Sequence, residues 1–395
     1  MSLQKNNYLN LYFSVGIFTI AWSFINTNIL EVGDNCGFDG RIYCLMAKGE
    51  VAFEPYSRRT ALPFLVGLFD FKDTYLGFYL INSIFLIFSI ILLNLIIKKI
   101  NSKYRILILS IFLVNPHTFR MLFSAPVLVD FLALMLILLL IYLSFKNRSI
   151  GTEIFLLAIL TFLVFVRENL SITYVFSLFI VNLLEYYRHD VSIRKVVLAF
   201  FEFIYILIIT YLAFLQPKID PPNYVPKTEI LEVIKYWFLE TVASGPNFLR
   251  VIFLTVFGLG IFGIIGITNY KFLFQNSTQI KILYLFSIML TLSSIFLGGD
   301  TARILLIPSV IFTLIYFMRE VDSKNLTLFF VLALVLWVPW AYSTGSEESF
   351  LTIYGQRYLS PNIALSQFAQ FLALGLLISV VYFFRKVPRF KSGHQ

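Results

Sequence analysis

Charged residues are scarce in this sequence. Asp, Glu, Lys and Arg make up only 13% of the 395 residues, whereas a soluble domain carries roughly a quarter because its surface must stay hydrated. Hydrophobic residues reach 59%, and the mean hydropathy is +0.83. This balance excludes a soluble enzyme, a nucleic-acid binder and a secreted disulfide scaffold as the main interpretation.

Cysteine and histidine are also rare. The only two cysteines, Cys36 and Cys44, lie in one predicted loop and can pair if that loop faces an oxidising compartment, but their spacing alone leaves pairing open. The three histidines, His117, His189 and His394, are too scattered to form a metal cluster. We therefore predict no cofactor, with a divalent metal left open as an alternative.

Long apolar runs are the main feature that is present. A run of about 20 residues, such as 76–97, crosses a hydrocarbon core of roughly 30 Å. We predict an all-α polytopic membrane protein of about twelve transmembrane helices, some of them short or broken. The candidate helices are 9–30, 76–97, 105–120, 125–145, 151–166, 169–186, 196–215, 248–268, 281–297, 303–318, 326–342 and 364–384.

The distribution of charge predicts the orientation in the membrane. The apolar run 9–30 is too long for a signal peptide and is followed by no small-residue cleavage site, so it is the first spanning helix. With the amino end inside, most basic residues fall in inner segments and most acidic residues in outer ones. We expect a multi-pass protein of the cell (inner) membrane. Residues 1–385 form one transmembrane domain, and both ends are cytoplasmic, including a basic tail, 386–395.

This topology explains the formal net charge of +9 without a nucleic-acid partner. Two outer loops are long. The first, 31–75, holds seven acidic residues and is expected to carry interfacial helices. The second, 216–247, begins with a proline-rich stretch and continues into an amphipathic interfacial helix. Because the predicted inner loops are short and basic, any chemistry belongs to the outer face.

One motif is misleading. GLGIFG at 258–263 matches the glycine fingerprint of dinucleotide-binding proteins, but it lies inside an apolar helix with no strand before it. We interpret these glycines as positions where helices pack closely.

The first outer loop contains the most informative pattern. Asp39, Tyr43 and Met46 follow one another at helical spacing, which places them on one face of a short helix. Arg58 and Arg59 follow, before the chain returns to the membrane. A single aspartate at the start of a helix is equally well explained as a helix cap, so the surrounding pattern carries the argument.

That pattern, Asp-x-x-x-Tyr-x-x-Met-Ala followed by basic residues and Leu-Pro, resembles the C-type glycosyltransferase (GT-C) superfamily, and in particular its bacterial members that use polyprenyl-phosphate sugars. Three later segments resemble the same superfamily: PVLVD at 126–130, VREN at 166–169, and GDTAR at 299–303. The resemblance implies a GT-C-like fold and assigns the role of general base to Asp39. Asp34 remains an alternative base, and the lack of a soluble carboxyl-terminal domain, which some relatives carry, leaves the acceptor open.

Charges at helix ends support these positions independently of the resemblance. An ionised side chain in a membrane protein usually faces a cavity or a partner, so Asp130 and Glu168 either line a site or pair with arginines and hold the bundle together. The planar guanidinium of arginine suits phosphate oxygens. The expected substrate-binding residues are Asp34, Arg41, Tyr43, Arg58, Arg59, Asp130, Arg167, Glu168, Asp300, Arg303 and Arg357.

The resulting hypothesis is an inverting glycosyltransferase that moves a sugar from a polyprenyl-phosphate donor to a glycan, lipid or protein acceptor on the extracytoplasmic face. A transporter or lipid flippase is the first alternative, although two matching halves are not evident. An O-antigen polymerase-like enzyme and a non-enzymatic membrane scaffold are the others. The expected partners are the donor lipid, the acceptor and the bilayer, with no nucleic acid.

Overall fold

The described part of the chain is a bundle of helices. A computed structural model describes residues 16–17, 36, 38–100, 104–115, 117–124, 127–145, 150–219, 245–268, 277–297, 304–318 and 333. Within these residues every regular element is helical, which confirms the predicted all-α class for this part. The elements are α2 (Phe38–Ala47), η1 (Tyr56–Arg58), α3 (Ala61–Gly67), α4 (Thr74–Lys99), α5 (Arg105–Val114), α6 (Phe119–Ser124), α7 (Asp130–Ser144), α8 (Ile150–Tyr187), α9 (Ile193–Phe214), α11 (Gly245–Thr268), α13 (Thr278–Leu297) and α15 (Leu306–Phe317).

Three of the described helices, α4, α8 and α9, are long and apolar enough to cross a membrane. The helix α4 leaves one whole face exposed, with residues three or four positions apart: Leu76, Leu80, Ile84, Ile87, Phe88 and Ile91. The helix α9 exposes Phe201, Ile208 and Leu212 in the same way. Apolar surface of this extent marks contact with another apolar medium, so these helices belong in a lipid bilayer. The count of twelve spans remains a prediction.

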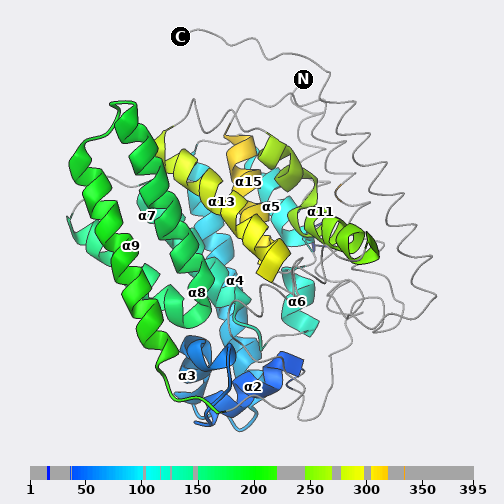
Figure 1. Ribbon diagram of the computed structural model, residues 1–395. Coiled ribbons are helices and arrows are strands. Elements are labelled where there is room, and N and C mark those ends of the chain that lie inside the picture. Colours follow the sequence, from blue (N-terminus) through cyan, green and yellow to red (C-terminus); the bar gives the residue numbers. More distant parts are fainter. Residues whose placement is uncertain are drawn as a thin grey trace.

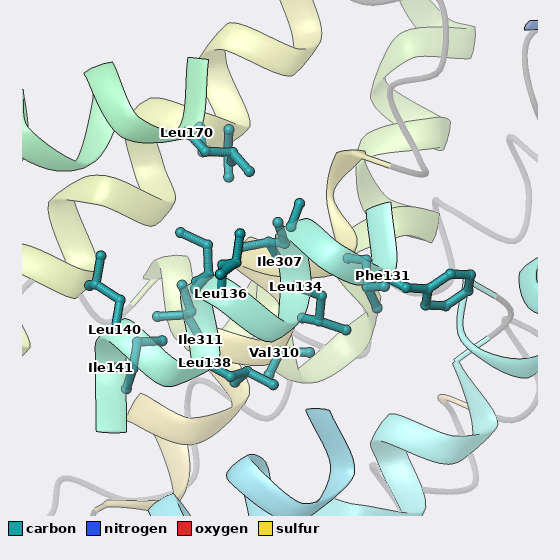
Figure 2. Close-up of a cluster of buried hydrophobic side chains, with 14 of the residues drawn as sticks. Phe131, Leu134, Leu136, Leu138, Leu140, Ile141, Leu170, Ile307, Val310 and Ile311 are labelled. Atoms are coloured by element: carbon teal, nitrogen blue, oxygen red, sulfur yellow. The ribbon is translucent and has the colours of Figure 1, made fainter. Parts of the chain in front are cut away.

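The described helices form a bundle (Figure 1), and α7 is one of its buried members. Most of its residues are buried, because its sequence is apolar on nearly every side and other helices pack around it. Figure 2 shows side chains of α7, such as Leu136 and Leu140, clustered with Leu170 of α8 and with Ile307 and Ile311 of α15. The core therefore joins segments from the middle and the late part of the described chain.

The packing of α11 against α15 depends on glycine. A Cβ at Gly266 would lie 2.6 Å from the Cβ of Phe312, closer than side chains approach. The hydroxyl of Ser309 donates a hydrogen bond to the Leu259 carbonyl oxygen (2.7 Å), and Gly260 interrupts α11 with a positive φ of 65°. Gly266, however, lies after the 258–263 motif, and a Cβ at Gly263 would meet Ser309 Cα only at 3.7 Å, so a packing role for the motif itself remains a prediction.

The described connections gather at two ends of the bundle. At one end, Lys99 at the end of α4 lies over the ring of Tyr142 near the end of α7, and Glu185 of α8 pairs with Lys281 of α13. The opposite end holds α2, η1 and α3, well separated from the turn between α8 and α9 (Figure 1). Both ends carry basic residues. Those at or beside the connections of the first end are Lys98, Lys99, Arg105, Arg188, Arg194 and Lys195, and those of the opposite end are Arg41, Lys48, Arg58, Arg59, Lys72 and Lys218.

Most of the predicted helices in this part agree with the structure, but two differ. The run 105–120 was expected to be one helix. That prediction is wrong, because α5 ends at Val114 and α6 begins at Phe119. Asn115 adopts an extended backbone, and its side chain accepts a hydrogen bond from the His117 amide (2.9 Å), which closes a turn. The helix expected at 125–145 begins only at Asp130.

Several predictions fall outside the described residues. These are the candidate helices 326–342 and 364–384, all but two residues of 9–30, and the interfacial helix in the loop 216–247. The first loop does carry the short helices α2, η1 and α3, as expected.

Candidate functional site

A sharp break in α8 organises the candidate site. Arg167 has an extended backbone (φ −161°, ψ 93°) inside an otherwise helical segment. The hydroxyl of Ser171 donates to the carbonyl oxygen of Leu160 at 2.7 Å, although 11 residues of continuous helix would rise about 16 Å. The second half of α8 therefore turns back towards the first half. The break predicted between 151–166 and 169–186 is confirmed.

Glu168, the residue after the break, contacts two arginines of the first loop. Its Oε1 lies 3.2 Å from Nη1 of Arg58, and its Oε2 lies 3.7 Å from Nε of Arg59. The Arg58, Glu168 and Arg59 side chains are 9%, 14% and 17% exposed. The site is thus largely desolvated, and its charges interact more strongly than they would in water.

Arg58 is held from several sides. Its Nε donates to Oε2 of Glu54 at 2.6 Å, and its guanidinium carbon lies 3.9 Å from the ring centroid of Phe214 at the end of α9. The other carboxylate oxygen of Glu54 accepts from the ammonium of Lys218 at 3.5 Å. The planar guanidinium of Arg58 can therefore contact the carboxylates of Glu54 and Glu168 through its edge and the ring of Phe214 through its face. The ammonium of a lysine could not make all three contacts in this geometry.

Arg59 lies between Glu168 and α2. Its Nη1 donates to the hydroxyl of Tyr43 at 3.5 Å, and Tyr43, which is 1% exposed, packs edge-on against Tyr56. Burial alone would lower the pKa of Arg59, but the neighbouring Tyr43 and Glu168 raise it above its ordinary value. Arg59 therefore remains a cation at every pH at which the protein is folded.

A second buried ion pair lies directly beside the first. Arg167, at the break itself, pairs with Asp130, the first residue of α7. Both side chains are buried. Arg167 thus connects α8 to α7, and Glu168 connects α8 to the first loop. The sequence left open whether Asp130 and Glu168 pair with arginines, and in the structure both of them do.

The structure brings together about half of the residues singled out from the sequence. Tyr43, Arg58, Arg59 and Glu168 form one connected cluster, and the Asp130–Arg167 pair adjoins it. Arg41 is exposed on α2. The remaining predicted residues lie outside the described part of the chain: Asp34, Asp300, Arg303 and Arg357.

Asp39, the expected general base, belongs by its backbone to α2, and its side chain lies outside the described part of the structure. The helical spacing that linked it to Tyr43 is confirmed for the backbone, because α2 spans Phe38–Ala47. The two cysteines that flank Asp39, Cys36 and Cys44, form a disulfide. The disulfide therefore covalently links the two ends of the segment that carries Asp39.

Three residues of the site were not among the candidates from the sequence: Glu54, Phe214 and Lys218. Glu54 lies four positions before Arg58, and this spacing in a charge-poor chain is a usable signal. Phe214 and Lys218 reach the site from the end of α9 and carry no comparable local pattern. Among the described residues, no three His, Cys, Asp or Glu side chains are placed to hold a metal ion.

No protein-family model, curated protein or solved structure matches this chain. The functional interpretation therefore depends on the residues and their arrangement.

Proposed function

We propose that this chain is an inverting glycosyltransferase that takes a sugar from a polyprenyl-phosphate donor and passes it to a glycan, lipid or protein acceptor outside the cytoplasm. The observation that carries the proposal is the largely buried cluster at the α8 break. In it, two arginines of the first loop meet Glu168 beside Tyr43 of α2, the helix that includes Asp39.

The placement of this cluster supports the proposal. It lies at one end of an apolar bundle, the end that carries the first loop. The charge distribution over the whole sequence predicts that this loop is outside, because cytoplasmic segments of membrane proteins are enriched in Lys and Arg. The Cys36–Cys44 disulfide in the same loop also favours an oxidising compartment. A polyprenyl-phosphate sugar in the outer leaflet would present its head group at this level.

The chemistry follows from the residues at this end. Asp39 takes the proton from an acceptor hydroxyl as its oxygen attacks the anomeric carbon from the side opposite the phosphate. A bond from the acceptor oxygen to the anomeric carbon forms, the bond from that carbon to the phosphate oxygen breaks, and polyprenyl phosphate leaves. Cations at this end stabilise the charge that develops on the phosphate. The step inverts the anomeric configuration.

The GT-C resemblance of the first-loop pattern and of the VREN segment points to the same activity. The confirmed break at Arg167 is the structural feature expected of that segment. The resemblance remains part of the proposal.

A transfer assay distinguishes the enzyme from a transporter or flippase. Purified protein is added to membranes of cells that lack it, which supply the acceptor, together with radiolabelled polyprenyl-phosphate sugars. We expect wild-type protein to move the label from the lipid to an acceptor and Asp39→Asn to lose at least a hundredfold in rate. Glu50→Gln, at an exposed position of the same loop, is the matched control and should retain the wild-type rate.

If the wild-type protein leaves the label on the donor, the enzyme proposal fails. If Asp39→Asn is as active as the wild type while Asp34→Asn is inactive, the general base is Asp34. Equal activity of all three variants shows that neither Asp39 nor Asp34 is the general base.

A further inference from the structure

Three buried polar atoms at the α8 break have no hydrogen-bond partner among the described residues: Nε of Arg59, Oε2 of Glu168 and Oδ1 of Asn169. A buried polar atom without a partner costs about 1–3 kcal/mol, and such atoms are uncommon in folded proteins. The three belong to one place, because Glu168 and Asn169 are consecutive and Arg59 Nε is 3.7 Å from Glu168 Oε2.

The type of each atom restricts what can satisfy it. Arg59 Nε is a donor, whereas Glu168 Oε2 and Asn169 Oδ1 are acceptors. A fully ionised phosphate satisfies only the donor, and the Glu168 carboxylate repels it. A hydroxyl group both donates and accepts. One hydroxyl oxygen at hydrogen-bond distance from both Arg59 Nε and Glu168 Oε2 is compatible with their 3.7 Å separation.

Arg58 adds a second restriction. Its Nε is bonded to Glu54, its Nη1 contacts Glu168, and its face lies on Phe214. Much of its capacity to bind an anion is therefore already used. Two cations at the same end are more open to solvent: Arg41 is exposed, and the Lys218 side chain, although it contacts Glu54 at 3.5 Å, is 49% exposed.

We infer that Arg59, Glu168 and Asn169 form a subsite for the hydroxyl groups of the transferred sugar, and that the donor phosphate is bound by the more exposed Arg41 and Lys218. This inference depends on the proposed function and assigns the parts of that site. In this arrangement the residues at the α8 break recognise the sugar. The cations nearer to solvent neutralise the charge of the phosphate.

Binding measurements on the purified full-length protein in lipid nanodiscs test the inference. The probes are farnesyl phosphate without a sugar and farnesyl phosphates that carry mannose, glucose, galactose or N-acetylglucosamine. Asn169→Leu keeps the number and branching of the side-chain heavy atoms but removes the acceptor, together with the amide donor. It leaves the residues that form the Arg58 and Arg59 contacts to Glu168 unchanged. The matched control is Asn182→Leu, the same change near the other end of α8, where the Asn182 amide bonds only within the helix in the described contacts.

We expect wild-type protein to bind at least one glycosylated probe more tightly than farnesyl phosphate. Asn169→Leu should weaken binding of that probe about five- to tenfold, the loss of about one hydrogen bond, with unchanged affinity for farnesyl phosphate. Asn182→Leu should change neither affinity. Retained binding of farnesyl phosphate shows that the Asn169→Leu variant is folded.

Two results overturn the inference alone: an unchanged preference for the glycosylated probe in Asn169→Leu, or an equal loss for both probes, which would make the subsite a phosphate site. If the wild-type protein binds neither kind of probe, the proposed function and the inference both fail. If it binds farnesyl phosphate and prefers no glycosylated probe, the sugar subsite fails and lipid-phosphate binding stands.

Discussion

Arg167 and Glu168 are adjacent in the chain but pair with different elements. Arg167 pairs with Asp130 at the start of α7, and Glu168 contacts Arg58 and Arg59 of the first loop. The extended backbone at Arg167 makes this possible, because consecutive side chains of an extended segment point in opposite directions. The non-helical backbone at Arg167 thus allows α8 to contact both α7 and the first loop through two adjacent residues.

Removing the charge of Asp130 should destabilise the protein. Asp130→Asn removes the carboxylate that pairs with Arg167 in a desolvated place, and breaking a buried ion pair by removing one partner costs about 3–5 kcal/mol. We expect a clearly lower midpoint of thermal unfolding in detergent, followed by loss of the monodisperse peak in size-exclusion chromatography.

The control for that variant is Asp73→Asn, the same chemical change at the start of another helix. Asp73 caps α4 by accepting from the amides of Tyr75 and Leu76, and asparagine caps a helix equally well. Its midpoint should stay at the wild-type value. An unchanged midpoint in Asp130→Asn would show that the ion pair contributes little to stability.

At the scale of single elements, glycine positions set the distance between helices. A methyl group at Gly266 would meet the Cβ of Phe312 at 2.6 Å and its carbonyl oxygen at 3.1 Å. Backbone and Cβ atoms cannot rotate away, so α11 and α15 would have to move apart.

Gly266→Ala should therefore destabilise the protein by about 1–3 kcal/mol, although alanine has the higher helix propensity. Gly263→Ala, one turn earlier, is the comparison, since its Cβ would first meet the Leu259 side chain of its own helix and then Ser309 Cα at 3.7 Å. The two thermal midpoints, measured in the same detergent, should differ, with Gly266→Ala the lower. Equal midpoints would show that α15 shifts without cost.

The helices that were predicted well are those whose apolar runs are bounded by charge or by turn residues. The run 76–97 agrees with α4, which ends at Lys98 and Lys99, and the Arg167–Glu168 break was recognised because two charges interrupt an apolar stretch. Hydropathy failed at 105–120, where the chain stays apolar on both sides of a turn. There the local signal is Asn115 followed by proline, which favours a turn.

The same contrast applies to the site. Arg58, Arg59, Glu168 and Tyr43 were found because charged and aromatic residues at outer helix ends are conspicuous in an apolar sequence. That Glu168 would meet both arginines was not predictable, since the contact spans more than one hundred residues of sequence. Phe214 was hidden for the opposite reason, because one more phenylalanine in an apolar helix gives no signal until its position beside Arg58 is known.

At the scale of the whole molecule, the account requires the two ends of the bundle to face different compartments. The native cysteines are both buried and disulfide-bonded, so they are replaced by serine. One cysteine is then introduced at an exposed position of either end, as Glu50→Cys or as Lys195→Cys.

A membrane-impermeant maleimide should label Glu50→Cys in intact cells and Lys195→Cys only after lysis. The reason is that Glu50 lies in the first loop, whereas Lys195 lies in the first turn of α9, beside the connection from α8 at the opposite end of the bundle. Labelling before and after lysis, read by the mass shift on a gel, gives the result directly. The reverse pattern would place the cluster in the cytoplasm and contradict a donor in the outer leaflet.

The most direct test of the central claim is mass spectrometry of polyprenyl lipids from cells that carry either wild-type protein or Asp39→Asn. The substitution keeps the shape of the side chain and removes its capacity to accept a proton. The account predicts that a polyprenyl-phosphate sugar, absent or scarce in wild-type cells, accumulates in the variant, and its mass names the class of sugar. An unchanged lipid profile, with the Asp39→Asn protein present at the wild-type level, would contradict the proposal that Asp39 drives consumption of such a donor.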